Sequence, residues 1–181
     1  MRSFILAAVL FAVSLTLGML VVAPDASAET LEKIGEMLGL LASLNSLQLF
    51  LMIFLNNTVK ALAVIVSGIF LGLPPLIFIS FNGFLAGMLI SGIQPTVGYG
   101  VVIASIAPHG VIEIPLMLLT TALGFAVGRE SLRRLTGGKS QVKSQLRRGL
   151  RTYFRWILPG LLAAAAIETF ITPLIIDLAG G

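Results

Sequence analysis

Two ionisable side chains stand four residues apart at the start of an apolar run. They are His109 and Glu113, in the sequence Pro-His-Gly-Val-Ile-Glu, and a spacing of four places them on one face of a helix. At membrane depth such groups are rare and by default indicate a functional site. At the outer interface, His109 would instead help to cap the helix and Glu113 would favour its positive N-terminal end. Both interpretations stay open.

A third ionisable side chain, Glu168, lies near the middle of the last apolar run. An isolated carboxylate in lipid is expected to take up a proton rather than stay charged, so Glu168 needs a polar partner. If it meets Glu113, the two carboxylates should share a proton and titrate as a pair, although spacing does not decide whether they meet. The predicted buried polar cluster has five members: Asn57, Asn82, His109, Glu113 and Glu168.

These residues do not complete a catalytic site of a familiar kind. His109 and Glu113 offer two metal ligands where catalytic zinc sites generally use three, and Glu168 is the available third. The chain has no cysteine, and its serines lack the strand-to-helix turn that exposes a nucleophile. We therefore predict no catalytic residue, metal or cofactor, and we expect that the protein is not an enzyme. An intramembrane hydrolase is the remaining enzymatic alternative.

The composition of the chain indicates what surrounds these side chains. Of its 181 residues, 57% are hydrophobic and 11% are charged, and the mean hydropathy is +1.03. Because soluble domains carry about 25% charged residues, lipid rather than water must surround most of the chain. The sequence predicts one integral membrane domain over residues 1–181, folded as an all-α bundle of transmembrane helices.

Five apolar runs are long enough to span a hydrocarbon core about 30 Å thick. They lie at 4–23, 57–79, 81–106 with a break around Gln94 to Gly98, 109–128 and 156–178. Pro74 and Pro75 are expected to end or kink the second helix, because proline removes a backbone donor and clashes with the preceding turn. The first run could instead belong to a cleaved signal peptide over 1–28, but it is longer than the usual apolar part of one.

An acidic segment over residues 29–50 follows the first run. Leucine and isoleucine recur there every three to four residues, which makes one apolar face. We expect an amphipathic helix that lies on the outer face of the membrane with its apolar side toward the lipid. The alternatives are the lower part of a long second spanning helix and a plain connector.

Nine of the twelve basic residues fall in one segment, 129–155, in which Glu130 is the single acid. The positive-inside rule makes this segment a cytoplasmic loop, and Arg2 then places the N-terminus inside and the C-terminus outside a cell membrane. We expect the loop to contact membrane lipids through their anionic headgroups. No nucleic-acid partner is expected, because the aromatic residues near the end of the loop fit an interfacial belt instead.

Three Gly-x-x-x-Gly pairs indicate how the helices pack. In lipid, helices associate through close backbone approach at small residues rather than through hydrophobic burial. A spacing of four puts both glycines of a pair on one helix face, so packing within the chain is predicted, with homodimerisation as the alternative. The six residues are Gly68, Gly72, Gly83, Gly87, Gly124 and Gly128.

Several short motifs follow one another in a recognisable order. They are Asn56-Asn57, Gly68-Ile69-Phe70-Leu71-Gly72, Asn82-Gly83-Phe84-Leu85-Ala86-Gly87, Pro108-His109-Gly110-Val111-Ile112-Glu113 and Gly124-Phe125-Ala126-Val127-Gly128. Over about residues 50 to 180 the chain thereby resembles the stage II sporulation protein M family. The resemblance implies a polytopic helical membrane protein without established catalytic residues. In spore-forming bacteria, the namesake of this family is a membrane partner of cell-wall-remodelling enzymes. Relatives also occur in organisms that do not sporulate.

Two functions are compatible with these features. The resemblance and the glycine pairs favour a non-catalytic scaffold that joins a membrane-protein partner, or a second copy of the chain, in a complex. The alternative is a small transporter or channel for ions or small solutes, because polar groups lie at membrane depth and a helix breaks near Pro95. The transporter hypothesis predicts a water-accessible polar cavity around four side chains, and a dry, lipid-facing Glu168 would count heavily against it. The four are Asn82, His109, Glu113 and Glu168.

Overall fold

The computed structural model describes residues 1–21 and 44–178, and the side chains of 93–109 and 176–178 lie outside that description. All regular structure in the described part is helical, so the predicted all-α class is confirmed. The elements are α1 (Arg2–Val21), α3 (Ser46–Ser67), α4 (Leu73–Leu135), α5 (Val142–Thr152), the π-helical turn η1 (Tyr153–Ile157), α6 (Leu158–Ala166), the π-helical turn η2 (Ile167–Ile171) and α7 (Thr172–Leu178).

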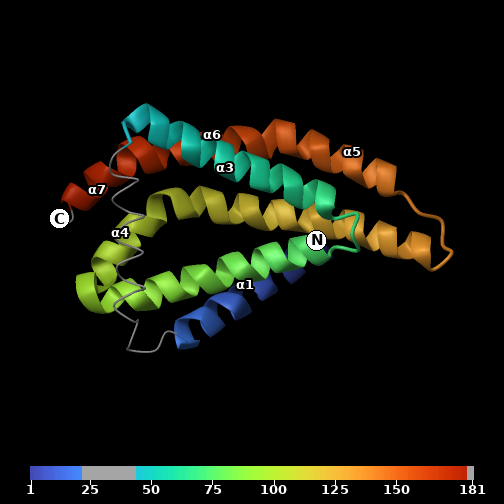
Figure 1. The fold of residues 1–181 in the computed structure, drawn as a ribbon, viewed down its shortest axis with the longest axis horizontal. Helices are drawn as coiled ribbons and strands as arrows, with labels where there is room; N and C mark the ends of the chain where they lie inside the picture. The colour runs from blue at the N-terminus through green and yellow to red at the C-terminus, as the bar shows by residue number, and fades with distance from the viewer. Residues whose placement is uncertain (22–43, 179–181) are drawn as a thin grey trace.

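Five helical stretches of the described chain are long and apolar enough to cross a membrane. They are Arg2–Val21, Ser46–Ser67, Leu73–Gly92, Gly110–Leu135 and Val142–Ile175. Successive stretches run in opposite directions, so the start of α1 and the connection from α4 to α5 lie toward one end of the bundle, and the C-terminus lies at the other (Figure 1). The prediction of a polytopic bundle with five spanning helices is therefore confirmed.

The predicted interfacial segment 29–50 falls mainly outside the described residues, but its last part forms the beginning of α3. Asn45 and Gln48 make a capping box there. The Asn45 side chain accepts a hydrogen bond from the Gln48 N–H at 2.9 Å, and the Gln48 side chain accepts one from the Asn45 N–H at 3.0 Å. The second span therefore begins at Ser46, and its predicted start at residue 57 is wrong.

The second span also ends earlier than predicted, because residues 68–72 form a tight turn. Leu71 and Gly72 have φ values of 58° and 78°, and glycine adopts a positive φ without steric cost. Pro74 lies in the first turn of α4, where a missing N–H is harmless and the fixed φ of proline suits a helix. The prediction that the prolines close a helix over 57–79 is wrong, since they open the next helix.

α4 is one helix that contains two spanning parts and reverses direction between them (Figure 1). Its backbone is helical throughout, so the break predicted around Gln94 to Gly98 is not seen. The two spans predicted at 81–106 and 109–128 lie at Leu73–Gly92 and Gly110–Leu135 instead. Pro95 and Pro108 fall between these two spanning parts. Each proline removes an intrahelical hydrogen bond, which allows a helix to bend.

The reversal of α4 brings two glycine pairs face to face. A Cβ atom on Gly68 would collide with the Gly124 carbonyl, and one on Gly128 would collide with the Gly72 backbone. We call these four residues the glycine seam. Gly68 and Gly72 lie in the turn before α4 rather than on one helix face as predicted. The seam provides the close backbone approach through which helices associate in lipid.

The third glycine pair lies where α1 packs against the first part of α4. A Cβ atom on Gly83 would lie 2.7 Å from the Phe11 carbonyl oxygen, and one on Gly87 would overlap the Leu15 carbonyl. Both positions therefore bring the two helix backbones into contact. All six predicted packing glycines take part in contacts within the chain.

The basic segment 129–155 is mainly helical rather than a loop. α4 continues to Leu135 and α5 begins at Val142, so only residues 136–141 connect the two helices. Leu146 and Gly149 of α5 face the protein interior, and arginine can lay its apolar stem along a helix while its charge stays in water. The last span therefore begins well before the predicted residue 156.

The apolar core lies where α3, η1 and α6 meet. It contains Ala61, Ile65, Tyr153, Ile157 and Leu161. The Tyr153 hydroxyl donates a hydrogen bond of 3.1 Å to the Thr58 carbonyl oxygen, which satisfies a buried polar group. This contact fixes the last span against α3 one residue away from Asn57.

Candidate functional site

Asn57 and Glu113 connect α3 to the second part of α4. Asn57 lies halfway along α3, Glu113 lies one turn beyond Gly110, and the Asn57 Nδ2 donates a hydrogen bond to the Glu113 Oε1. The two residues are 56 positions apart, and Gly68 and Gly124 of the glycine seam have the same separation. The two helices therefore run parallel with one constant offset. Because the glycine seam fixes that offset, it also places Asn57 beside Glu113.

Asn57 and Glu113 line a first pocket of about 250 Å³ that lies among α1, α3, both parts of α4 and α6. Polar side chains from three further positions, Lys60, Asn82 and Thr120, also line this pocket. Aromatic rings, from Phe11 and Phe78, form part of its apolar wall. The pocket thus combines amide, carboxylate and amine groups with an apolar lining, as small-ligand sites usually do.

Glu168 joins Asn57 and Glu113 at a second pocket, of about 400 Å³, which Asn56 and Met52 also line. The two glutamates come from different helices and face the same space. Because Asn57 and Glu113 belong to both pockets, their hydrogen bond lies between them. We call the two together the polar pockets. Glu168 thus lines a pocket that it shares with the polar side chains of Asn56, Asn57 and Glu113.

Glu168 is carried by the π-helical turn η2. A π turn holds one more residue than an α turn, and such single turns occur frequently at functional sites. The Thr172 hydroxyl donates to the Ile167 carbonyl oxygen at 3.3 Å, five residues back, and so helps to satisfy the widened turn. The extra residue rotates the helix after Ile171 relative to the part before Ile167.

The other two members of the predicted polar cluster are placed differently. Asn82 lines the first pocket only, and its side-chain amide donates to the Phe78 carbonyl oxygen of its own helix at 2.7 Å. The side chain of His109 lies outside the described part of the chain, so its role stays a prediction. Asn57, Glu113 and Glu168 are thus the three that share one pocket.

The chemistry of the second pocket is that of oxygen ligands. Its lining includes the carboxylates of Glu113 and Glu168 and the carboxamides of Asn56 and Asn57. Carboxylate and amide oxygens suit hard cations, and paired carboxylates can hold a shared proton. Within the described residues, no three His, Cys, Asp or Glu side chains gather as a catalytic zinc site would require.

Sequence reasoning missed three polar residues that line the polar pockets, Lys60, Asn56 and Thr120. Lys60 follows Asn57 by three positions and therefore shares its helix face. Asn56 precedes Asn57 directly, but adjacent helical residues point in different directions, so spacing did not suggest it. The helical periodicity was thus sufficient to find Lys60.

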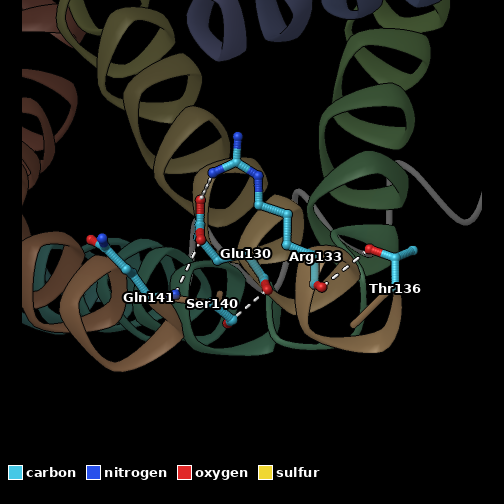
Figure 2. Close-up of polar contacts among 5 residues, drawn as sticks. All are labelled: Glu130, Arg133, Thr136, Ser140 and Gln141. Atoms are coloured by element: carbon cyan, nitrogen blue, oxygen red, sulfur yellow. Dashed lines mark hydrogen bonds and ion pairs between the residues drawn. The ribbon is translucent and has the colours of Figure 1, made fainter. Parts of the chain in front are cut away.

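Glu130 forms a second polar site, at the connection from α4 to α5, that the sequence analysis also missed. Figure 2 shows its carboxylate between the Arg133 Nη1, at 2.9 Å, and the Gln141 backbone N–H, at 3.1 Å. The Ser140 hydroxyl donates to the Glu130 carbonyl oxygen at 2.9 Å. With 3% of its surface exposed, Glu130 holds the start of α5 against the end of α4. The sequence signal that could have indicated this site is that Glu130 is the single acidic residue among nine basic residues in segment 129–155.

Comparison with known proteins agrees with this architecture. The family described as Stage II sporulation protein M matches residues 7–173 of the chain. An uncharacterized protein of Methanocaldococcus jannaschii is 31% identical over 124 residues, which make up 66% of this chain and 68% of that protein. No solved structure matches the chain. The region matched by the family contains both polar pockets and the glycine seam.

Proposed function

The chain belongs to the stage II sporulation protein M family, and from that premise we propose that it binds a small cation or a proton at the polar pockets and passes it across a cell membrane. One observation carries the proposal. Glu113 and Glu168, from different helices, line one pocket together with Asn57. Ionisable side chains at membrane depth that face a cavity commonly mark the pathway of an ion or proton.

The charge and chemistry of the second pocket favour a cation over an anion. Two carboxylates and two carboxamides line it, without a basic side chain among its described lining residues. The hydrogen bond from Asn57 to Glu113 separates this pocket from the first one. An ion that moves between the pockets would therefore pass that pair and would then meet the positive charge of Lys60 in the first pocket.

Flux through the purified protein in liposomes tests this proposal. Proton, sodium and potassium gradients are applied in turn, and the wild-type protein is expected to dissipate one of them faster than empty liposomes do. Glu113→Gln and Glu168→Gln should remove this flux, since a neutral amide neither binds a cation as strongly nor exchanges a proton. Glu130→Gln is the matched control, because Glu130 lies away from the polar pockets, and its flux per folded molecule should stay at the wild-type level.

A scaffold within a membrane complex is the second candidate function. The hydrogen bond from Asn57 to Glu113 favours it, because a carboxylate that ties α3 to α4 can serve structure alone. The glycine seam supports the same hypothesis, since it holds these helices at close range. A rigid bundle of this kind could present a fixed surface to a membrane-protein partner or to a second copy of the chain.

The two functions predict different behaviour of one variant. If the protein is a scaffold, wild-type liposomes show no flux, and Glu113→Gln lowers recovery of the chain with its crosslinked membrane partners. If it conducts an ion, Glu113→Gln abolishes flux while the same crosslinked species persist. Crosslinking in native membranes and flux in liposomes, measured on the same variant, therefore separate them.

The orientation that accompanies the proposal places the connection from α4 to α5 in the cytoplasm. Its basis is the positive-inside rule applied to the basic residues of that region. Because the chain has no cysteine, a Lys139→Cys variant carries a single thiol. In intact cells this thiol should resist a membrane-impermeant reagent and should react after the cells are opened. Reaction of this thiol in intact cells would show that the protein has the opposite orientation.

A further inference from the structure

A basic groove runs along α5 and η1, apart from the polar pockets. It has a volume of about 550 Å³, and none of its lining residues belongs to either polar pocket. The side chains that matter below are Ser144, Arg147, Arg148, Arg151, Arg155 and Trp156. We call this feature the arginine groove.

Packing fixes the direction in which the arginine groove faces. Gly149 is buried, and a Cβ atom there would lie 2.8 Å from the Ile65 Cγ2 of α3. Tyr153 is also buried and is bonded to the Thr58 carbonyl. Arg147, Arg151 and Arg155 follow one another at intervals of four and thus share one helix face. Because the opposite face is held against α3, the arginines remain turned outward.

The positive charge of the arginine groove is not neutralised within the described part of the chain. Arg133 and Glu130, which lie outside the groove, form an ion pair. Among the described residues, none of the four groove arginines forms one. Like charges one turn apart on a helix repel each other. A bound anion would remove this repulsion, and guanidinium groups match the oxygens of a phosphate with two parallel hydrogen bonds each.

Trp156, at one end of the arginine groove, is of the residue type expected at the level of the lipid headgroups. Trp156 is 62% exposed, and the Arg155 guanidinium carbon lies 5.6 Å from the centroid of its ring. Exposed tryptophan is enriched where hydrocarbon meets water. Phosphate groups are the abundant anions at that depth, and the Ser144 hydroxyl adds a neutral donor for one.

We propose that the arginine groove is a binding site for a phosphate group, with Arg148 and Arg151 as its central ligands. The same oxygens are offered by the headgroup of an anionic phospholipid and by soluble phosphate. This differs from general attraction of a basic surface to a membrane, because it requires these arginines rather than a given number of charges.

Trp156 is the single tryptophan of the chain, so its fluorescence reports on the arginine groove directly. The protein is purified in a maltoside detergent, which contains no phosphate. One arm of the experiment titrates inorganic phosphate, and the other titrates phosphatidylglycerol in mixed micelles, both at constant ionic strength. A saturable change in the phosphatidylglycerol arm alone assigns the site to a lipid headgroup, and a change in both arms assigns it to phosphate from either source.

Two double variants of equal charge test the requirement for particular arginines. Arg148→Gln with Arg151→Gln should weaken the titrated binding by about tenfold or more, because charge-assisted bidentate contacts are lost. Arg134→Gln with Lys139→Gln removes the same charge outside the arginine groove and should leave the affinity within about twofold of wild type. Lysine at positions 148 and 151 should give an intermediate affinity, since lysine keeps the charge but loses the paired donors.

The proposal is overturned by either of two results. Equal weakening by the two glutamine double variants would show that total charge alone attracts the anion. An unchanged Trp156 signal in both arms would show that no phosphate binds beside that ring. Circular dichroism of each variant confirms that a loss of binding occurs in a folded protein.

Discussion

The glycine seam and the polar pockets lie on the same two helices and differ in how those helices meet. At the seam, α3 and its following turn touch the second part of α4 so closely that a single Cβ atom would not fit. Eleven residues earlier on both helices, Asn57 and Glu113 form a hydrogen bond, and a pocket lies on each side of that bond. The seam therefore fixes the register, and the polar pockets use the space that this register leaves.

Two carboxylates of α4, Glu130 and Glu113, differ in the same way in their surroundings. Glu130, near the seam, is almost fully buried and receives hydrogen bonds from Arg133 and from the Gln141 backbone. Glu113 lines two cavities and shares one of them with Glu168. The two carboxylates are therefore expected to have different roles: Glu130 stabilises the fold, and Glu113, which accepts a hydrogen bond from Asn57, belongs to the proposed ion site.

Adding a methyl group to the glycine seam should have the largest effect on stability. A Cβ atom at Gly124 would lie 2.8 Å from the Val64 carbonyl oxygen, so Gly124→Ala must separate the two helices. We expect a loss of about 3 kcal/mol, as for overpacked cores, measured by reversible unfolding in mixed micelles. Gly92→Ala is the control, since a Cβ atom there meets nothing within 4 Å. Equal effects of the two variants would mean that the seam is not tightly packed.

The same substitution at the two carboxylates should separate stability from function. Glu130→Gln removes a charged acceptor from Arg133 and from the Gln141 N–H, and is expected to cost about 2 kcal/mol of unfolding free energy. Glu113→Gln keeps an oxygen that can accept from Asn57, so we expect a loss below about 1 kcal/mol. Unfolding of both variants under identical conditions measures the difference, and the reverse order would refute the division of roles drawn above.

The smallest effect is expected at the exposed end of the ion pair. The Arg133 side chain is 59% exposed, and surface ion pairs contribute at most about 1 kcal/mol. Arg133→Gln should therefore change stability by less than Glu130→Gln does, and high salt should narrow the gap between Arg133→Gln and wild type. A loss as large as that of Glu130→Gln would show that Arg133, rather than the Gln141 N–H, is the main partner of the carboxylate.

The fold class and the number of spans can be predicted from the sequence, because charge depletion and run length determine them almost alone. The ends of the spans cannot. A Pro-Pro pair is compatible with the end or the beginning of a helix, and the positive φ of Gly72 and its contact with Gly128 decide between them. Both are consequences of tertiary packing, which local sequence does not specify.

The candidate site was predictable in its members but not in its geometry. Glu113 and Glu168 attract notice because ionisable residues are rare in apolar runs. Their placement around one pocket depends on the register set by the glycine seam and on the π-helical turn that carries Glu168. Neither this register nor a π-helical turn is marked by a reliable pattern in the local sequence. The buried role of Glu130 likewise depends on Gln141, eleven residues away.

Water access to position 168 tests the central claim most directly, because the claim requires a hydrated cavity at that depth. The cysteine-free chain allows three single-thiol variants of the last span: Glu168→Cys in the second pocket, Ala165→Cys at a site 1% exposed, and Phe170→Cys at a site 51% exposed on the apolar exterior. In liposomes, a small water-soluble methanethiosulfonate should modify the thiol at 168 and spare the other two, since reaction needs both space and an ionised thiol. If the thiol at 168 is as unreactive as those at 165 and 170, the pocket is dry and the proposed pathway does not exist.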